Sequence, residues 1–218
     1  MNAPHPAFSP PQRVVLEGRY VRLEPLQPHR AAGLYAATSG EGEADRYRWL
    51  FDFPPGSEAA LTARLAEAAT SEDPLHFAVV NLSTGLAAGR QALMRMVPKD
   101  GVIEIGAVQW GRGVARTPLA TEALYLFARY AFETLGNRRF EWKCNNANLP
   151  SKRAAERFGF TFEGVFRQHM IIKGESRDTA WFSMLDGEWP SRKAGLEAWL
   201  DPDNFDADGV QKTKLRFG

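Results

Sequence analysis

The chain has 218 residues, a length that suits one well-buried domain and is short for two of ordinary size. Apolar residues make up 44% of it and charged residues 24%, which is typical of a soluble globular protein. The formal net charge of +1 provides no overall field for nucleic acid or an anionic membrane, and no apolar run approaches the roughly 20 residues that span a bilayer. The single cysteine, Cys144, excludes an internal disulfide and the usual zinc-site spacings, so we expect no metal.

The first half of the chain predicts short strands, two helices and a hairpin. Residues 1–12 contain four prolines and no signal pattern, so we expect a flexible tail and a cytoplasmic protein. Ser57 can cap a helix, and Ser83-Thr84-Gly85 between two apolar runs is typical of a hairpin turn. Strands are expected at 13–16, 20–23, 77–81, 87–97 and 102–108, and helices at 28–38 and 57–69.

The second half predicts alternating strands and helices. Thr117 and Pro118 are typical of a helix start, and Gly136 lies just past the expected end. Asn148 can cap a further helix, and Gly164 indicates a bulge in the strand that begins near residue 160. Other strands are expected at 139–144 and 178–185. The pattern predicts one α/β domain over 1–218, with a mixed, mostly antiparallel sheet and helices on both faces. Residues 190–218 are expected to form a C-terminal extension, polar from Trp199 onward, on the surface.

Charge is distributed unevenly along the chain. Residues 41–73 contain eight acidic residues and three arginines, whereas residues 112–157 contain nine basic residues and four glutamates. The two stretches can be solvated faces of opposite sign. They can also mark a cationic ligand near the first and an anionic ligand near the second.

Four motifs between residues 103 and 190 resemble the GNAT acetyltransferases, nearest to their RimJ/RimL-type branch. In chain order they are Ile103-Glu104-Ile105-Gly106, Arg116-Thr117-Pro118-Leu119-Ala120-Thr121-Glu122-Ala123, Asn148-Leu149-Pro150-Ser151 with Glu156-Arg157-Phe158-Gly159-Phe160, and Phe162-Glu163-Gly164 with Arg177-Asp178 and Glu188-Trp189-Pro190. The resemblance implies the GNAT fold and transfer of an acetyl group from acetyl-CoA to a primary amine, here a protein or peptide N-terminus.

The second motif resembles the family's pyrophosphate loop, Gln-x-x-Gly-x-Gly/Ala, at a helix N-terminus. Unpaired N–H groups and the positive end of the helix dipole favour an anion there. Ala115 stands where the family has Gln, and Pro118 stands where it has the central Gly and contributes no N–H. Arg116 can supply compensating charge. The resemblance implies acetyl-CoA contacts from Ala115, Arg116, Thr117, Leu119, Ala120, Thr121, Asn148 and Ser151. The alternatives are that Thr117 only starts a helix and that Asn148 is a helix cap, which does not exclude contact with the cofactor.

Acetyl transfer needs a neutral amine and a protonated leaving thiolate. A lysine ammonium has a pKa of about 10.4 and a peptide α-amine about 7.7–8.0, so deprotonating lysine costs roughly 3.5 kcal/mol more. Glu104, mid-strand between two isoleucines, is the first candidate base because burial would raise its pKa. His169 is the alternative base, and Glu163 is interpreted as structural. Ser151 is the candidate acid; Cys144 is interpreted as packing rather than as an acetyl carrier, which favours direct attack in a ternary complex.

Two other hypotheses remain open. The departures at Ala115 and Pro118 are compatible with an acyl-CoA-binding or regulatory module without turnover. Alternatively, the acceptor is a small amine such as an antibiotic or polyamine, with Trp49, Phe51 and Phe53 as an acceptor wall or as a local apolar cluster. We expect no nucleic-acid or membrane partner, and either a monomer or a homodimer.

Overall fold

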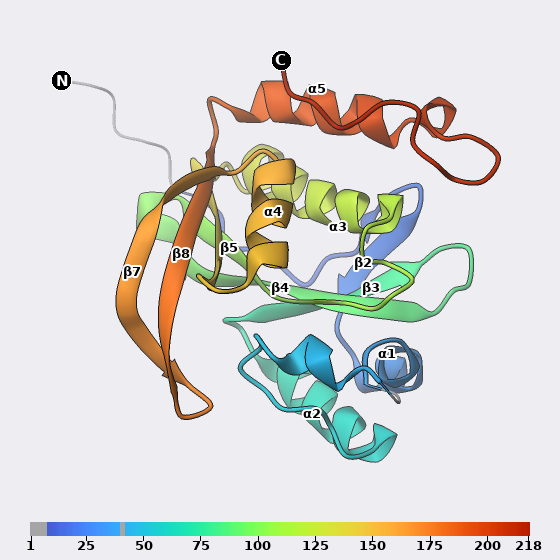
Figure 1. Ribbon diagram of the computed structural model, residues 1–218, viewed down its shortest axis with the longest axis vertical. Helices are drawn as coiled ribbons and strands as arrows, with labels where there is room; N and C mark the ends of the chain where they lie inside the picture. Colours follow the sequence, from blue (N-terminus) through green and yellow to red (C-terminus); the bar gives the residue numbers. More distant parts are fainter. Residues whose placement is uncertain (1–7, 40–41) are drawn as a thin grey trace.

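The computed structural model describes residues 8–39 and 42–218, which share one mixed sheet covered by helices on both faces (Figure 1). The strand order is β1-β2-β3-β4-β5-β6-β8-β7, and only the β5–β6 pair is parallel. The predicted fold class is therefore confirmed. The strands are β1 (Leu16–Glu17), β2 (Val21–Pro25), β3 (Leu75–Asn81), β4 (Ala87–Val97), β5 (Val102–Trp110), β6 (Arg139–Asn145), β7 (Thr161–Ile172) and β8 (Glu175–Leu185). The α-helices are α1 (Ala31–Thr38), α2 (Glu58–Thr70), α3 (Pro118–Arg129), α4 (Leu149–Arg157) and α5 (Trp189–Leu200).

Helix ends and turns follow the predicted local signals. The Ser57 side chain accepts a hydrogen bond from the N–H of Ala60 and caps α2. Thr117 caps α3, and Asn148 caps α4 by accepting from the N–H of Ser151 at 3.2 Å. The predicted bulge in β7 is present, since the register shifts between Phe162 and Gly164, where the backbone φ of Gly164 is +149°. These signals are local, so the sequence displays them directly.

Two apolar cores lie on the two faces of the sheet. Helices α3 and α5 cover one face, and α1 and α2 cover the other face mainly along β3 and β4 (Figure 1). Strand β3 contributes to both, because Phe77 and Val79 belong to the first core and Ala78 and Val80 to the second. Among the described residues, α1 also reaches β5, and one of the candidate site residues, Glu104, lies on this second face of β5.

The parallel β5–β6 pair opens partway along its length. Its ladder ends at Ile105 opposite Trp142, although β5 continues to Trp110 and β6 to Asn145. Beyond the last pair, Ala107 takes a left-handed backbone with φ of +49°, and the register with β4 shifts nearby. The two strands therefore separate and leave an opening in the middle of the sheet.

The first hairpin is fixed to α3 by one buried carboxylate. Glu122 accepts hydrogen bonds from the N–H groups of Arg19, Tyr20 and Val21 at 2.7, 2.6 and 2.7 Å. A Cβ on Gly18 would lie 2.4 Å from the carboxyl carbon of Glu122, so only glycine allows this approach. The turn predicted around Gly18 is thus also a tertiary contact.

Both ends of the described chain pack against the domain, whereas the sequence predicted a flexible N-terminal tail and a C-terminal extension on the surface. The N–H of Ser9 donates to the Leu135 carbonyl and that of Gln12 to the Tyr130 hydroxyl, while residues 1–7 of the expected tail lie outside the described residues. Helix α5 was not predicted, and its Leu196 and Trp199 are buried in the main core. No helix in the described ranges is long and apolar enough to cross a membrane.

Candidate active site

The opening between β5 and β6 is where two spaces meet. One, the large groove, has a volume of about 790 Å³ and lies along the N-terminus of α3, α4 and the C-terminal segment. The other, the small cavity, has a volume of about 150 Å³ and reaches Glu104 on the opposite face of the sheet. Both are lined by Val108, Trp142, Asn148 and Ser151. A ligand in each could therefore make contact through the sheet.

The large groove contains seven of the eight residues predicted to hold the acetyl donor. The lining includes Ala115, Arg116, Thr117, Ala120, Thr121, Asn148 and Ser151. Leu119 is the exception, because its side chain packs against the main core. Sequence reasoning missed the last part of the lining, which comes from the C-terminal segment as Trp199, Phe205, Gly209, Val210 and Gln211.

Few backbone donors remain at the predicted phosphate loop. Pro118 has no N–H, and the N–H of Leu119 donates to the Thr117 hydroxyl at 3.2 Å. The N–H of Ala120 has no partner within the helix, and that of Arg116, whose φ is +66°, has none among the described residues. The cradle therefore relies on fewer N–H groups than a glycine-rich loop would offer.

Basic side chains strengthen the groove as an anion site. The described lining holds Arg116, Arg153 and Arg157 and no acidic residue. Arg157 donates to the Thr121 hydroxyl at 3.0 Å and lies over the Trp199 ring, and burial lowers its pKa. These arginines belong to the basic stretch at 112–157, which supports the ligand interpretation of that stretch. The groove therefore suits the phosphates of coenzyme A.

Ser151 stands between the two spaces and is oriented by its neighbours. Its hydroxyl accepts a hydrogen bond from the Trp142 indole N–H at 3.0 Å. Cys144 lines the small cavity nearby, and burial raises the pKa of its thiol despite a hydrogen bond with Ser151. A raised thiol pKa keeps Cys144 protonated at neutral pH, which makes it a poor nucleophile.

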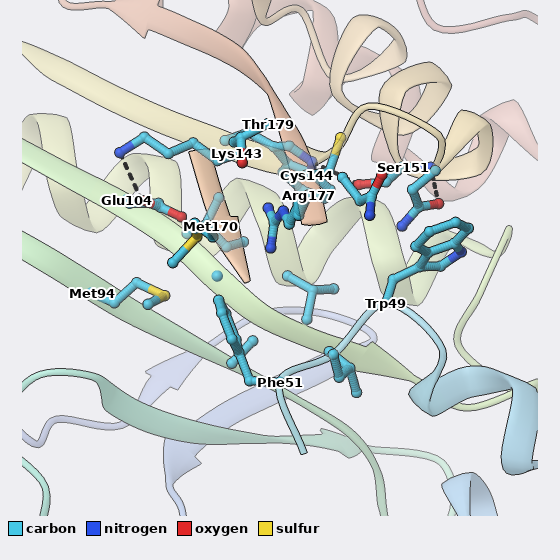
Figure 2. A pocket seen from close by; sticks show the side chains of 18 of the residues that line it. Trp49, Phe51, Met94, Glu104, Lys143, Cys144, Ser151, Met170, Arg177 and Thr179 are labelled. Atoms are coloured by element: carbon cyan, nitrogen blue, oxygen red, sulfur yellow. Dashed lines mark hydrogen bonds and ion pairs between the residues drawn. The ribbon is translucent and has the colours of Figure 1, made fainter. Parts of the chain in front are cut away.

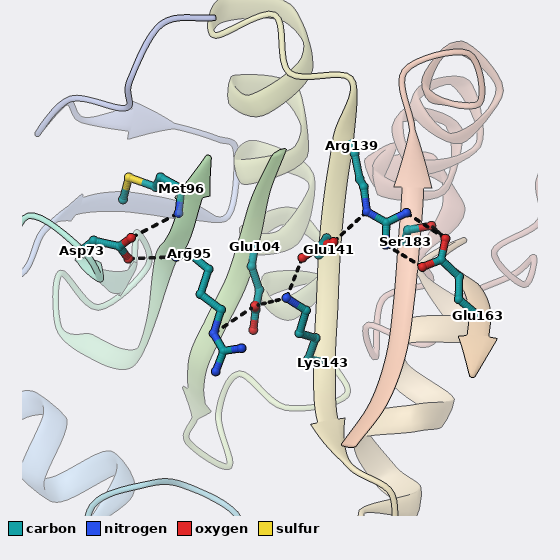
Figure 3. Close-up of polar contacts among 9 residues, drawn as sticks. All are labelled: Asp73, Arg95, Met96, Glu104, Arg139, Glu141, Lys143, Glu163 and Ser183. Carbon is teal, nitrogen blue, oxygen red and sulfur yellow. Dashed lines mark hydrogen bonds and ion pairs between the residues drawn. The ribbon is translucent and has the colours of Figure 1, made fainter. Parts of the chain in front are cut away.

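Glu104 lies at the far end of the small cavity within a buried charge network (Figure 3). Its side chain is 5% exposed, and its carboxylate lies 2.9 Å from the Lys143 ammonium and 3.5 Å from the Arg95 guanidinium. Lys143 also contacts Glu141 at 2.6 Å. Burial raises the pKa of Glu104 and Lys143 opposes that shift, so the carboxylate is a stronger base than a solvated one.

His169 is not brought to either space. It lies in an irregular part of β7, where its Nδ1 is 3.0 Å from the Thr179 hydroxyl and its ring packs against Phe166 and Trp181. Burial and nearby cations lower its pKa. Thr179 lines the small cavity but His169 does not, so the structure separates it from Glu104 and Ser151.

The loop between α1 and α2 covers the small cavity (Figure 2). Of the three aromatic residues predicted there, Trp49 and Phe51 line it, whereas Phe53 lies against Lys173 on the β7–β8 hairpin. None of the described acidic residues between 42 and 73 lines the cavity. Glu43 pairs with Arg46 and Arg112, and Asp52 pairs with Arg90. In the described lining Glu104 is the one carboxylate, which favours the interpretation of the acidic stretch as a solvated face.

Comparison with known proteins identifies the class. Residues 21–161 match the Acetyltransferase (GNAT) domain, which is well over half of the chain, so this protein belongs to the GNAT acetyltransferase family. Members of this family use acetyl-CoA.

Individual relatives agree in fold over most of the chain. It is similar to a GCN5-related N-acetyltransferase from Brucella melitensis, with 54% identity, a TM-score of 0.94, and coverage of 96% of this chain and 95% of that one. A GNAT-family protein from Chromobacterium violaceum ATCC 12472 is 38% identical, with a TM-score of 0.79 over 87% of this chain and 95% of that one. The uncharacterised N-acetyltransferase p20 of Bacillus licheniformis is 31% identical over 39% of this chain, a match that spans 46% of that relative.

Proposed function

We propose that this protein transfers an acetyl group from acetyl-CoA to a primary amine by direct attack within a ternary complex. The observation that carries the proposal is the meeting of the large groove and the small cavity at Trp142, Asn148 and Ser151. The groove has the charge and the helix N-terminus that suit a pyrophosphate. The cavity has a buried carboxylate that suits an amine.

The reaction requires two proton movements, for which the site offers two groups. The acceptor ammonium loses a proton to Glu104, directly or through water, and its nitrogen then attacks the thioester carbonyl carbon. The carbon–sulfur bond breaks, and the thiolate leaves as the free thiol after accepting a proton at the Ser151 end. The net products are the N-acetyl amine, coenzyme A and one proton. Glu104 is preferred to His169 because only Glu104 lines the cavity.

The order of the four sequence motifs supports the RimJ/RimL-type branch and hence a protein or peptide N-terminus as acceptor. An α-amine also suits a site with one carboxylate, because it loses its proton more readily than lysine does. The small cavity has a volume of about 150 Å³, which is enough for a small amine, so a small amine is the second candidate class of acceptor.

The scarcity of backbone donors at Pro118 favours one rival function, an acyl-CoA-binding module without turnover. Calorimetric titration of acetyl-CoA, followed by thiol detection with N-terminal peptides, lysine peptides and small amines, separates the two. We expect binding, and thiol release with one acceptor class. Binding without release from any acceptor supports the module, and no binding refutes both.

A charge reversal tests whether the large groove holds the donor. Arg116→Glu places a carboxylate at the N-terminus of α3 and should weaken acetyl-CoA binding about tenfold or more. Arg167→Glu is the matched control, because Arg167 is exposed on β7, has no ion pair among the described residues and does not line the groove. Equal weakening by both variants would indicate a general charge effect and place the donor elsewhere.

A further inference from the structure

Four basic residues line the small cavity, and three of them have carboxylate partners. Arg46 pairs with Glu43, Arg95 with Glu104, and Lys143 with both Glu104 and Glu141. The fourth, Arg177, forms no ion pair and its guanidinium makes no hydrogen bond with any described residue. The Arg177 charge therefore has no carboxylate in direct contact, and Glu104 acts on it only at longer range.

Arg177 is deeply buried for a charged side chain without an ion pair. The residue is 7% exposed, its Nε has no hydrogen-bond partner among the described residues, and its nearest aromatic contact is the Phe51 ring at 5.7 Å. Removing a guanidinium from water without a partner costs several kcal/mol. Phe51 offers only a weak cation–π contact at that distance, which does not offset this cost.

The surroundings of Arg177 fit a ligand that carries an amine and an acid. Figure 2 shows its side chain pointing into the small cavity, which Glu104 and Ser151 also line. Met94 and Met170 contribute flexible apolar surface to the same lining. An arginine fork binds a carboxylate through two parallel hydrogen bonds, a geometry that lysine does not offer.

We propose that Arg177 binds a carboxylate of the amine acceptor, so that the substrate is an amine with an acidic group close to it. The inference rests on the proposed acetyl transfer and names the chemistry of its acceptor. The ammonium faces Glu104 and the carboxylate faces Arg177, with the carbon chain against Trp49 and Phe51. A cavity of about 150 Å³ accommodates a molecule the size of benzene, which limits the bound part to about one amino-acid residue.

Two sources can supply this carboxylate, and the experiment separates them. The first is the α-carboxylate of a free amino acid, compared with the corresponding amino acid amide. The second is the side chain of Asp or Glu at a peptide N-terminus, compared with Asn or Gln in C-terminally amidated tripeptides. Binding of each member to the full chain saturated with coenzyme A is measured by calorimetry, which needs no turnover.

We expect the acid of at least one pair to bind about tenfold or more tightly than its amide. Arg177→Gln should abolish this difference, and Arg177→Lys should restore only part of it. Arg167→Gln is the matched control, because Arg167 is exposed on β7 and does not line the small cavity. Retained coenzyme A affinity and thermal unfolding near that of the wild type show that the Gln variant is folded.

Several results overturn the inference. It is wrong if no acid binds wild-type protein more tightly than its amide, or if the preference survives in Arg177→Gln. It is also wrong if Arg177→Gln lowers the rate of acetyl transfer to acids and to amides by the same factor, because Arg177 would then act on the acetyl group. Thiol release is measured separately with the same acceptors. A preference in binding without any thiol release would support the acidic ligand and refute acetyl transfer.

Discussion

Strands β5 and β6 carry different chemistry on their two faces. The face toward α3 holds Ile103, Ile105, Phe140 and Trp142, each less than 5% exposed. The opposite face holds Glu104, Glu141 and Lys143, which are nearly as well buried. Alternation along the strands places these residues back to back, so a close-packed apolar layer supports a buried ionic one.

The ionic face is a network rather than a set of surface pairs (Figure 3). Glu104 and Glu141 are direct neighbours across the β5–β6 pair, and Lys143 bridges them while its ammonium lies 3.9 Å from the Trp181 ring centre. Buried charges of this kind contribute little net stability but hold a specific arrangement. We infer that the apolar face determines whether the chain folds, and the ionic face determines how Glu104 is presented.

The largest expected effect comes from breaking the apolar face. Phe140 is fully buried, and its ring packs against Phe132 and Phe160. Phe140→Ala should lower the free energy of unfolding by about 3–5 kcal/mol, measured by urea denaturation. Phe53→Ala, at a side chain that is 61% exposed, should cost less than about 1 kcal/mol. Similar costs for the two variants would mean that the core is elsewhere.

Breaking the ionic face at Glu104 should affect turnover instead. Glu104→Gln should lower kcat about 100-fold, because the proposed base is lost while Lys143 keeps Glu141 as a partner. Wild-type activity should fall as the pH drops through the pKa of Glu104, which burial places above its ordinary 4.5, and the variant should lack this limb. Glu141→Gln removes the other partner of Lys143 outside the small cavity, so it should keep most activity. Equal losses would assign Glu104 a structural role.

Substitution of Ser151 tests the point where the large groove meets the small cavity. Ser151→Ala should lower kcat about tenfold through loss of a donor to the thiolate, and it leaves the Trp142 N–H without its acceptor. That unpaired N–H should cost about 1–3 kcal/mol of stability. Trp142→Phe removes the same hydrogen bond but keeps the hydroxyl, so single-turnover rates should separate chemistry from positioning. If Trp142→Phe is as slow as Ser151→Ala, the hydrogen bond between Trp142 and Ser151 accounts for the effect and Ser151 is not the proton donor.

The smallest effect is expected at the rim of the ionic face. Arg139 donates to both oxygens of Glu163 at 2.8 and 2.5 Å, and with Ser183 it lowers the pKa of Glu163 to about 2. Because the folded pKa is depressed, this stabilisation is present above the ordinary 4.5 and is lost as the pH falls toward about 2. The carboxylate is 38% exposed, so solvent screening limits the effect to about 1 kcal/mol or less.

Chemical denaturation between pH 2 and 7 measures that dependence. Glu163→Gln should flatten the profile between pH 4.5 and 2 relative to wild type. Glu175→Gln is the control, since the Glu175 side chain has no ion pair or hydrogen bond among the described residues, and its profile should match wild type. An unchanged profile in Glu163→Gln would mean that the Arg139 pair does not stabilise the fold.

The sequence predicted those elements whose signals are local. The β3–β4 hairpin and the starts of α2 and α3 follow from turn and capping residues within a few positions. Helix α5 was missed because tertiary packing stabilises it. Gly195 lowers its helix propensity, yet a Cβ there would lie 2.4 Å from the Arg216 carbonyl of the C-terminal segment. A glycine that serves a distant contact weakens the local helical pattern.

The residues of the candidate site differ in how far the sequence points to them. Strand alternation singled out Glu104, and the motif at Asn148 singled out Ser151, because each lies in a short readable pattern. Arg177 was quoted only as part of a motif. What distinguishes it is the absence of a carboxylate partner among the described residues. That absence is visible only where β5, β6, β8 and the loop around Phe51 come together. A single strand does not show which of its charges will be paired.

The carboxylate that fixes the first hairpin has a consequence for synthesis on the ribosome. Glu122 follows its partners Arg19, Tyr20 and Val21 by 101 to 103 residues, so their N–H groups have no native acceptor until more than half of the chain has been made. Contacts this distant in sequence form slowly and late. During synthesis, the N–H groups of this first hairpin therefore stay without their native acceptor until α3 has been made.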